Sequence, residues 1–308
     1  MEKTMYSMRK LAVAALLGMA AYGAHAANVL VVLSDSDHLD LKDDKVFATG
    51  FYLNELMQPV KALLDAGHQV TFATPQGKAP TLDVTSADKM YFGGDDHAMR
   101  DYRALLDRLH ITSREHSPVI SLARVEQIGY GHFDAVYVPG GHAPMQDLST
   151  SPAVGRLLAD FHARGKTTAL VCHGPIALLS TLPDAPGFAR KLAAGNAGDG
   201  DTKWIYAGYR MTVISNAEEE QAKGLLGGGA MKFYPQTALQ RAGGIYSSNE
   251  VPFTAHVVTD RELITGQNPA SALDVAGEML KRLKQAVQST GNAGSSMSQG
   301  EANRGSAT

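Results

Sequence analysis

The only cysteine of the 308-residue sequence, Cys172, lies in the stretch TTALVCHGPIALL. The apolar run 167–171 is typical of a buried strand, and Gly174 and Pro175 then favour a tight turn and the first turn of a helix. This strand–turn–helix layout is the shape of a nucleophile elbow, in which amides of the following helix favour a thiolate. The stretch therefore predicts a reactive thiol, and the alternative is an inert cysteine in the core.

The residue after the cysteine is a histidine, His173. An imidazole beside a thiol can act as its general base when a carboxylate orients the ring. The backbone amide of His173 is also placed to donate a hydrogen bond to an oxyanion that develops at the elbow. Neighbouring side chains on a regular element point apart, so the sequence alone leaves open whether this imidazole reaches the sulfur.

A second strand end carries two glycines, Gly140 and Gly141, in the stretch VPGGHAPMQDL. Glycine lets backbone amides approach a ligand closely, so the amide of Gly141 is a candidate for a second oxyanion donor. A tight turn that binds nothing is the alternative.

One glutamate falls on the apolar side of a predicted helix. Glu55, in the stretch TGFYLNELMQP, lies near Phe51 and Leu56 on helical spacing, away from Lys61 and Asp65. A carboxyl group on such a face has a raised pKa or a partner. The alternative is an ordinary exposed glutamate.

Three consecutive glutamates, 218–220, follow another strand end in the stretch SNAEEEQAKG. Asn216 can cap the helix that begins there, which puts Glu219 at the third helical position of a capping pattern. This structural role competes with a second one, in which an acid of this stretch orients His173.

The elements that position these residues alternate between strand and helix along the chain. Near-continuous apolar strands are typical of a parallel sheet covered by helices on both faces. Active sites of such sheets lie at the carboxyl ends of the strands, where the cysteine and the glycines fall. The expected fold is therefore α/β, a three-layer α/β/α sandwich with a mostly parallel central sheet of the flavodoxin-like type. The expected strands are 28–34, 69–75, 133–141, 167–172 and 209–215, with a hairpin at 256–266. The expected helices are 49–68, 101–112, 151–165, 175–182, 216–226 and 268–287. A loop is expected from about 76 to 94.

The N-terminus has the composition of an export signal. Arg9 and Lys10 precede the apolar run LAVAALLGMAAYG, and the small residues of AHA at 24–26 suit a signal peptidase. The run is short for a membrane span, and no stop-transfer charges follow it. We therefore expect a signal peptide at 1–26, cleavage near Ala26 and export, to the periplasm.

Composition limits the partners of the mature chain. A formal net charge of −3 gives no sign of binding to nucleic acid or to an anionic membrane. A single cysteine forms no intramolecular disulfide, and an exported protein exposes an unpaired thiol to oxidation. No metal-binding, dinucleotide or phosphate-loop motif occurs, so no metal and no cofactor is predicted. Residues 27–287 are expected to form one domain, and residues 288–308, rich in Ser, Gly, Asn and Ala, a disordered tail.

Together with YRMTVISNAEEE and LITGQNPASA, these motifs occur in one order between Asn28 and Leu283. In these motifs and in their order along the sequence, the chain resembles the ThiJ/PfpI superfamily, within the class I glutamine-amidotransferase-like fold. It resembles more narrowly the branch of glutathione-independent glyoxalases (glyoxalase III) and chaperone-like proteins. That family often has glycine after GGH, where this chain has Ala143, and an alanine would be strained there if the position needs a positive φ.

The resemblance implies a set of four catalytic side chains. Cys172 would be the nucleophile and His173 its base. Glu55 would be a buried carboxyl beside the sulfur, and Glu219 the acid that orients His173. A shift of one residue in the helix at 216–226 would select a different glutamate.

The activity implied is conversion of methylglyoxal, or a similar 2-oxoaldehyde, to lactate without glutathione. The thiolate would add to the aldehyde, and the amides of Gly141 and His173, beside Gly140, would hold the oxyanion. His173 or Glu55 would move a proton through an enediol, and water would hydrolyse the thioester. The small-molecule substrate would need neither metal nor organic cofactor.

Two other functions remain open at this point. The same residues suit a hydrolase, either a peptidase or a deglycase-type amidase that acts on glycated adducts. The third hypothesis is a stress-related holdase chaperone whose cysteine is a redox sensor or a relic. Homodimers are common among the proteins that the chain resembles.

Overall fold

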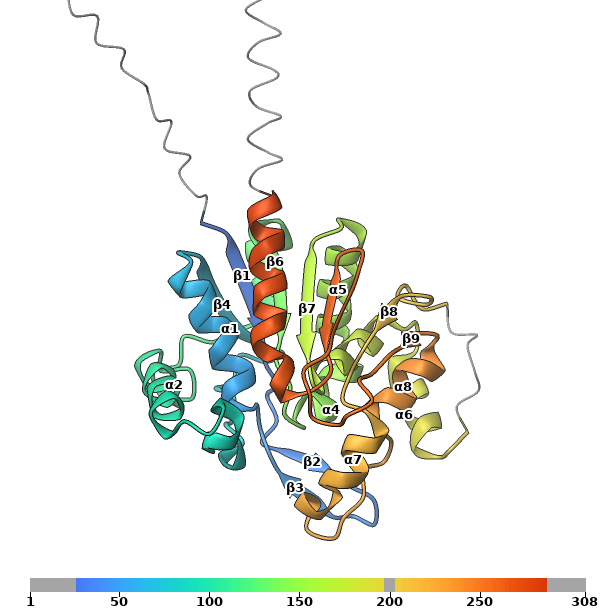
Figure 1. Ribbon diagram of the computed structural model, residues 1–308. Helices are drawn as coiled ribbons and strands as arrows, with labels where there is room; N and C mark the ends of the chain where they lie inside the picture. Colours follow the sequence, from blue (N-terminus) through green and yellow to red (C-terminus); the bar gives the residue numbers. More distant parts are fainter. Residues whose placement is uncertain (1–25, 197–202, 287–308) are drawn as a thin grey trace, which may run out of the picture.

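The computed structural model describes residues 26–196 and 203–286, and seven of its strands form one central sheet (Figure 1). The strands are β1 (Asn28–Val32), β4 (Gln69–Thr74), β5 (Ile120–Ser121), β6 (Ala135–Val138), β7 (Thr167–Val171), β10 (Val257–Asp260) and β11 (Leu263–Gly266). Their order across the sheet is β10-β11-β7-β6-β1-β4-β5. All neighbours are parallel except β10, which forms an antiparallel hairpin with β11.

The order of the inner strands identifies the topology. The five inner strands are β1, β4, β6, β7 and β11. If they are renumbered 1 to 5 along the chain, their order across the sheet is 2-1-3-4-5, which is the flavodoxin-like arrangement. The register pairs Val29 with Ala135 and Thr168 with Leu263. The predicted α/β class, the mostly parallel sheet and the hairpin at 256–266 are confirmed.

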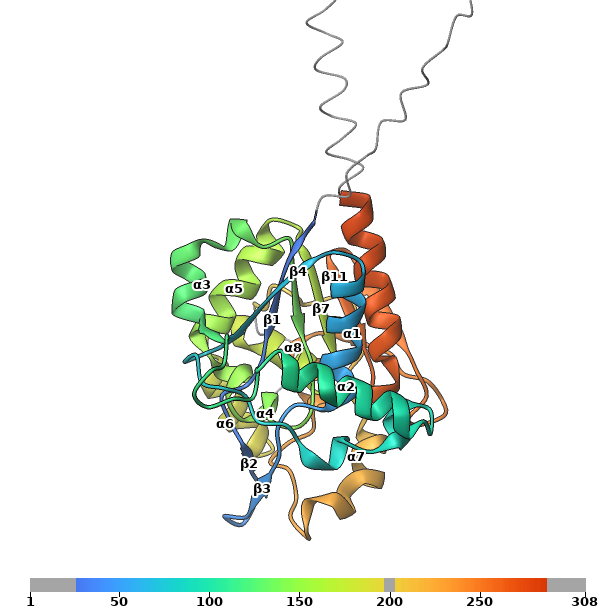
Figure 2. The ribbon, with the colours of Figure 1, turned by 90° about the vertical axis from the view of Figure 1, so that its left-hand side faces the viewer.

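Helices cover both faces of the sheet. Figures 1 and 2 show α1 (Leu53–Asp65) and the C-terminal helix of residues 272–286 on one face, and α3 (Leu122–Ile128) and α5 (Pro152–Ala163) on the other. The inner strands β1, β6, β7 and β11 are almost completely buried, as their near-continuous apolar sequences predict. The predicted three-layer sandwich is therefore present.

The first two turns of α1 are buried on every side, from Leu53 to Val60. An ion pair between Lys61 and Asp65, 2.5 Å apart, marks the exposed part of the helix. Burial at the start of α1 therefore depends on what packs around it, not only on which side of the helix faces the sheet.

The loop expected at 76–94 is one of the segments that cover the start of α1. The amide of Phe51 donates to the carbonyl of Thr81 at 2.9 Å, and the amide of Leu53 donates to the Ser86 hydroxyl at 2.9 Å. The hydroxyl replaces a side-chain cap that Tyr52, at the N-cap, does not provide. Two 3₁₀ turns, η1 (Val84–Ser86) and η2 (Lys89–Phe92), interrupt this loop.

The strand predicted at 209–215 is mostly absent. Only β8 (Arg210–Met211) forms, and it pairs with β9 (Ile245–Tyr246) outside the central sheet. The place beside β7 that this segment would need is taken by β11. The segment instead crosses the ends of these two strands, where the Ile214 amide donates to the Cys172 carbonyl at 3.1 Å.

The helix predicted at 175–182 is a 3₁₀ helix, η5 (Gly174–Thr181). The hydroxyl groups of Ser180 and Thr181 donate to the carbonyls of Ala177 and Leu178, at 2.6 and 2.7 Å. Such back-bonding competes with the α-helical pattern.

The remaining elements complete the two outer layers and the edge beyond the carboxyl ends of the strands. They are β2 (His38–Asp40), β3 (Val46–Ala48), α2 (Asp96–Arg108), α4 (Pro144–Asp147), α6 (Ala185–Ala193), α7 (Asn216–Ala222), α8 (Pro235–Ala242), η3 (Tyr130–His132), η4 (Leu148–Thr150), η6 (Lys223–Leu226) and η7 (Pro269–Ser271).

Residues 1–25 of the predicted signal peptide and the predicted tail at 288–308 lie outside the described residues, and both segments stay predictions, as does cleavage near Ala26. Within residues 26–196 and 203–286, no helix combines the length and the apolar character needed to cross a bilayer.

Candidate active site

Cys172 directly follows β7 and has a strained backbone conformation, with φ of +59°. Its amide donates to the Gly266 carbonyl at 2.9 Å, and its carbonyl accepts from Ile214. A Cβ on Gly174 would lie 2.4 Å from the Val138 carbonyl oxygen, so only glycine lets the turn pack against β6. Left-handed backbone at a residue other than glycine is costly and is held by its surroundings. The turn predicted at this position is therefore present, with its thiol at the carboxyl edge of the sheet.

The imidazole of His173 turns back toward the sulfur. The Cys172 Sγ lies 3.2 Å from His173 Nδ1, and His173 Nε2 lies 2.8 Å from Glu219 Oε1. Burial alone would raise the pKa of Glu219, but the charge of His173 and its hydrogen bond lower it. Glu219 is thus an ionised acceptor, which requires the proton on Nε2 and leaves Nδ1 free to accept from the thiol. Cysteine, histidine and glutamate form a triad.

The neighbouring glutamate, Glu218, has a structural role. Ser215 is the N-cap of α7, and its side chain and that of Glu218 form a reciprocal capping box. The prediction that Asn216 caps this helix is therefore wrong by one residue. The correct register follows the S-x-x-E pattern of residues 215–218, and it leaves Glu219 free to reach His173.

Glu55 is completely buried beside the elbow. Its Oε2 accepts a hydrogen bond from the Gly140 amide at 2.7 Å, and its Oε1 has no hydrogen-bond partner in the described part of the chain. Burial raises the pKa of Glu55 to about 8, although the Gly140 amide and the adjacent Cys172 thiol oppose the shift. A carboxyl group with such a pKa could carry a proton near neutral pH.

The glycine turn differs from the prediction in one respect. The Gly140 amide is occupied by Glu55, so it is not an oxyanion donor. Position 140 still requires a glycine, because a Cβ there would lie 2.6 Å from Glu55 Oε2 and 2.8 Å from the Cβ of Cys172. Among the described residues, no acceptor takes the amide hydrogen of Gly141 or of His173. Ala143 has φ of −56°, so the alanine causes no strain.

The surroundings of the cysteine oppose ionisation of its thiol. Burial raises its pKa well above the usual value, and the carboxyl groups of Glu55 and Glu219 raise it further. Burial and these carboxyl groups therefore oppose the effect of the helix amides, which favour a thiolate. The sulfur must lose its proton as it reacts, and His173 Nδ1 is placed to accept it.

His142 belongs to the site, although the sequence did not single it out. Its ring centroid lies 4.2 Å from that of His173, and its Nε2 lies 4.0 Å from Glu219 Oε2. Burial, and then the neighbouring His173, lower the pKa of His142 to about 3, so its ring is neutral. The available signal was its position directly after the glycine pair at a strand end.

The same three side chains could hold a metal ion. Donor atoms of His142, His173 and Glu219 lie within 4.8 Å of one another, and all three residues are buried. Two imidazoles and a carboxylate suit a transition metal such as zinc. However, an ion there would displace the proton between His173 and Glu219, so metal binding would compete with the triad.

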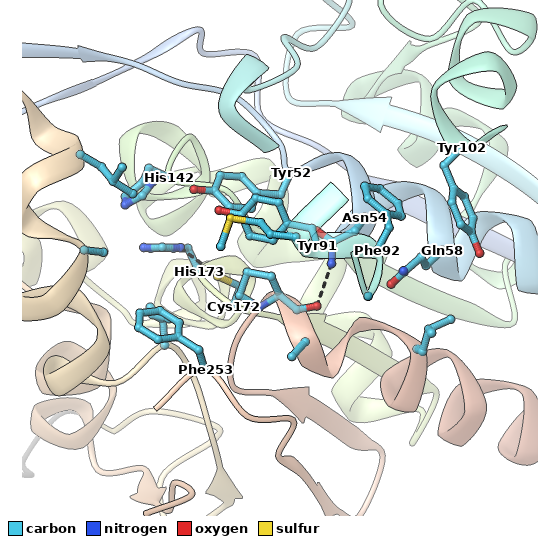
Figure 3. A pocket seen from close by; sticks show the side chains of 18 of the residues that line it. Tyr52, Asn54, Gln58, Tyr91, Phe92, Tyr102, His142, Cys172, His173 and Phe253 are labelled. Carbon is cyan, nitrogen blue, oxygen red and sulfur yellow. Dashed lines mark hydrogen bonds between the residues drawn. The ribbon is translucent and has the colours of Figure 1, made fainter. Parts of the chain in front are cut away.

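The thiol opens into a cavity of about 850 Å³ (Figure 3). The walls come from α1, the loop at 90–93, α2, α7 and the segment that leads into the C-terminal helix. The lining residues are Tyr52, Asn54, Gln58, Met90, Tyr91, Phe92, Gly93, Ala98, Tyr102, His142, Cys172, His173, Ile214, Glu219, Gln221, Ala222, Leu225, Phe253, Pro269, Ala270 and Leu273.

Fold and site together define a flavodoxin-like α/β protein with a buried cysteine–histidine–glutamate triad on an elbow and a second carboxyl beside the sulfur. Residues 47–194 match the family described as ThiJ/PfpI family-like. Over this segment, which carries Glu55, the glycine turn and the elbow, the chain is similar to the ThiJ/PfpI superfamily, and two of the relatives are named as enzymes.

Three relatives illustrate the similarity. The protein/nucleic acid deglycase HchA of Staphylococcus aureus is 24% identical over 262 residues, which cover 84% of this chain and 81% of that protein. The Rapid Encystment Protein of Francisella tularensis superposes with a TM-score of 0.62 at 23% identity, covering 83% of this chain and 99% of the other. The glyoxalase III of Candida albicans gives 0.61 at 19% identity, with coverages of 84% and 98%. The two structures support the fold.

Proposed function

We propose that this protein is a glutathione-independent glyoxalase, which converts methylglyoxal or a similar 2-oxoaldehyde to the 2-hydroxy acid. The observation that supports this reaction best is the Glu55 carboxyl beside the Cys172 thiol, with its pKa near 8. A triad is sufficient for hydrolysis, whereas an internal redox isomerisation also needs a group that carries a proton between two carbons. Glu55 is not a member of the triad, so it is available to carry this proton between the two carbons.

The first step forms a thiohemiacetal. His173 Nδ1 accepts the thiol proton while Sγ of Cys172 bonds to the aldehyde carbon, and Glu219 stabilises the imidazolium that results. The aldehyde oxygen becomes an oxyanion, to which the amides of Gly141 and His173 would donate. The imidazolium then returns the proton to this oxygen.

The second step moves a hydrogen between carbons. The Glu55 carboxylate removes the proton from the former aldehyde carbon, and the electron pair forms the double bond of an enediolate. Glu55 returns its proton to the neighbouring carbon, and the hydroxyl proton passes from the first oxygen to the second. The sequence left His173 and Glu55 as alternative bases; Glu55 is favoured because His173 is already committed to the thiol and to Glu219.

Hydrolysis completes the cycle. His173 accepts a proton from water, the hydroxide attacks the thioester carbon, and the bond from that carbon to sulfur breaks. The departing sulfur takes the proton back from His173, so the thiol is restored and the 2-hydroxy acid is released. None of these steps needs an added oxidant or reductant.

A deglycase-type hydrolase is the second candidate. The relative HchA is named as a protein/nucleic acid deglycase, and the cavity of about 850 Å³ has room for an adduct larger than methylglyoxal. In this reaction the triad would cleave the bond between the oxoaldehyde carbon and an amine. The predicted signal peptide would put either reaction outside the cytoplasm.

The test is lactate formation from methylglyoxal without glutathione. Wild-type protein should produce lactate, whereas Cys172→Ala and Glu55→Gln should each reduce kcat/KM by at least about 10²-fold. Lack of turnover in the wild type would overturn the proposal, and full turnover in Cys172→Ala would overturn the mechanism. Amine release from a glycated peptide, with no lactate from free methylglyoxal, would favour the deglycase.

A further inference from the structure

The cavity above Cys172 is much larger than the smallest 2-oxoaldehyde. Its volume is about 850 Å³, within the range of about 300–1,000 Å³ that is typical of sites for drug-sized ligands. Methylglyoxal has five non-hydrogen atoms, which would fill at most roughly 150 Å³ even if each took the space of a water molecule, about 30 Å³. Most of the cavity would stay empty with this substrate bound.

Aromatic rings form one side of the cavity. Phe92 stacks on Tyr102, with ring centroids 5.4 Å apart, and Tyr52 meets Tyr91 edge to face at 5.3 Å. In Figure 3, Phe92 and Tyr102 lie on the side away from His142. These contacts hold the rings in place before a ligand binds, so a flat apolar group would find a preformed surface.

Neutral polar groups line the same part of the cavity as Phe92 and Tyr102 (Figure 3). Asn54 and Gln58 are one turn apart on α1, and both line the cavity. The amide nitrogen of Asn54 donates to the Pro269 carbonyl at 2.8 Å, which fixes the side chain (Figure 3). Among the described residues that line the cavity, the ionisable side chains are those of Cys172, the three tyrosines, the two histidines and Glu219, which is bonded to His173. None of these described lining residues is a lysine or an arginine that could pair with a phosphate or carboxylate of a ligand.

Large apolar side chains surround the opening. Met90, Leu225, Phe253 and Leu273 each line the cavity, and their exposed fractions are 70%, 52%, 45% and 53%. They come from four segments that are far apart in the sequence. An apolar opening favours the entry of an apolar ligand and gives no attraction for a charged one.

We propose that the natural substrate is a neutral 2-oxoaldehyde with a bulky aromatic group, which lies between the aromatic side and Asn54 and Gln58 while the aldehyde meets Cys172. This inference rests on the proposed glyoxalase function and names its substrate class. The region lined by Asn54, Gln58, Phe92 and Tyr102 is termed the aromatic arm of the cavity (Figure 3).

Steady-state kinetics with two substrates test the proposal. The wild-type kcat/KM should be at least about tenfold higher for phenylglyoxal than for methylglyoxal, because the ring buries apolar surface that a methyl group lacks. Leu273→Asp, which puts a charge on an exposed apolar residue of the cavity lining, should reduce this ratio about tenfold. Val46→Asp, an exposed apolar residue of β3 that does not line the cavity, is the matched control and should leave the ratio unchanged.

A binding measurement separates this inference from the proposed function. Calorimetry on Cys172→Ala, with the unreactive ketones 2-hydroxyacetophenone and hydroxyacetone, should show at least about tenfold tighter binding of the aromatic compound. Tighter binding of the aromatic ketone to Cys172→Ala, with no turnover of either oxoaldehyde by the wild type, would support the aromatic arm as a binding site and overturn the glyoxalase function. Equal kcat/KM for phenylglyoxal and methylglyoxal, together with equal affinity for 2-hydroxyacetophenone and hydroxyacetone, would overturn the proposed role of the aromatic arm. It would leave the glyoxalase function standing.

Discussion

His173 Nε2 and Glu219 Oε1 lie 2.8 Å apart, and this bond decides the chemistry of the site. Since the carboxylate must accept, the imidazole keeps its proton on Nε2 and presents Nδ1 to the Cys172 thiol, 3.2 Å away. The bond exists because Glu218, the preceding residue, takes the capping position in α7. Two adjacent glutamates thus have separate roles, one structural and one directed at the histidine.

Glu219→Gln should impair catalysis much more than stability. The amide cannot stabilise the imidazolium that forms when His173 takes the thiol proton, so kcat/KM should fall by about 10²–10⁴-fold. Glu220→Gln is the matched control, because Glu220 is exposed and bonds to Tyr234 and Lys223 instead. Its kinetics should equal those of the wild type. Equal losses in both variants would remove Glu219 from the mechanism.

Glu218→Gln should show the opposite pattern. Glu218 is completely buried and accepts hydrogen bonds from Ser215, Phe253, Gln267 and Asn268. An amide can accept at only one of its two ends, so the variant should lose about 1–3 kcal/mol of unfolding free energy. Thermal unfolding should show a fall in Tm of several degrees. An unchanged Tm would contradict the assigned capping role.

The pH dependence of activity should report on Glu55. Its pKa of about 8 means that the carboxylate, the form that removes the carbon-bound proton, is scarce at pH 6 and predominant at pH 9. The logarithm of kcat/KM should therefore rise with pH and level off above about 8. A profile of methylglyoxal turnover between pH 5.5 and 9.5 would show it. A plateau already present at pH 6 would mean that another group is the base.

The same raised pKa makes stability depend on pH. In the unfolded chain Glu55 has an ordinary pKa near 4.5, so between about 4.5 and 8 the folded protein binds more protons than the unfolded one. This contribution of Glu55 is complete below 4.5 and is lost as pH rises to about 8. Relative to Glu55→Gln, the wild type should become less stable over this range, by at least about 1 kcal/mol. Parallel Tm curves of the two proteins would argue against a buried ionisable Glu55.

Zinc should inhibit the enzyme. Donor atoms of His142, His173 and Glu219 lie within 4.8 Å of one another. A metal ion bound by them would replace the proton of the His173–Glu219 hydrogen bond. Micromolar Zn²⁺ should lower turnover, and EDTA should restore it. His142→Gln removes one ligand and should raise the concentration for half-inhibition by at least about tenfold. Zinc activation, or equal inhibition of both proteins, would contradict this competition.

Local sequence patterns determined much of the fold. Apolar runs of strand length, alternating with helical spacing, predict a parallel sheet covered on both faces, because each element must bury its apolar side. The glycine and proline after Cys172 predict the turn that the structure has, since the conformation of a turn depends mostly on residues within it. The apolar surroundings of Glu55 likewise pointed to burial.

Tertiary structure alone decided how these parts meet. The pairing of β11 with β7 displaced residues 209–215 from the sheet, because a strand edge can pair with only one neighbour. The Gly140 amide turned to Glu55, and His142 came to lie beside His173, through contacts between segments far apart in the chain. The capping pattern was readable in the sequence, but only the path of α7 across the elbow put Glu219 against the imidazole. Sequence therefore predicted a reactive cysteine, whereas distances of a few ångströms between separate loops determined its partners, the carboxyl groups that oppose its ionisation and the size of the cavity beside it.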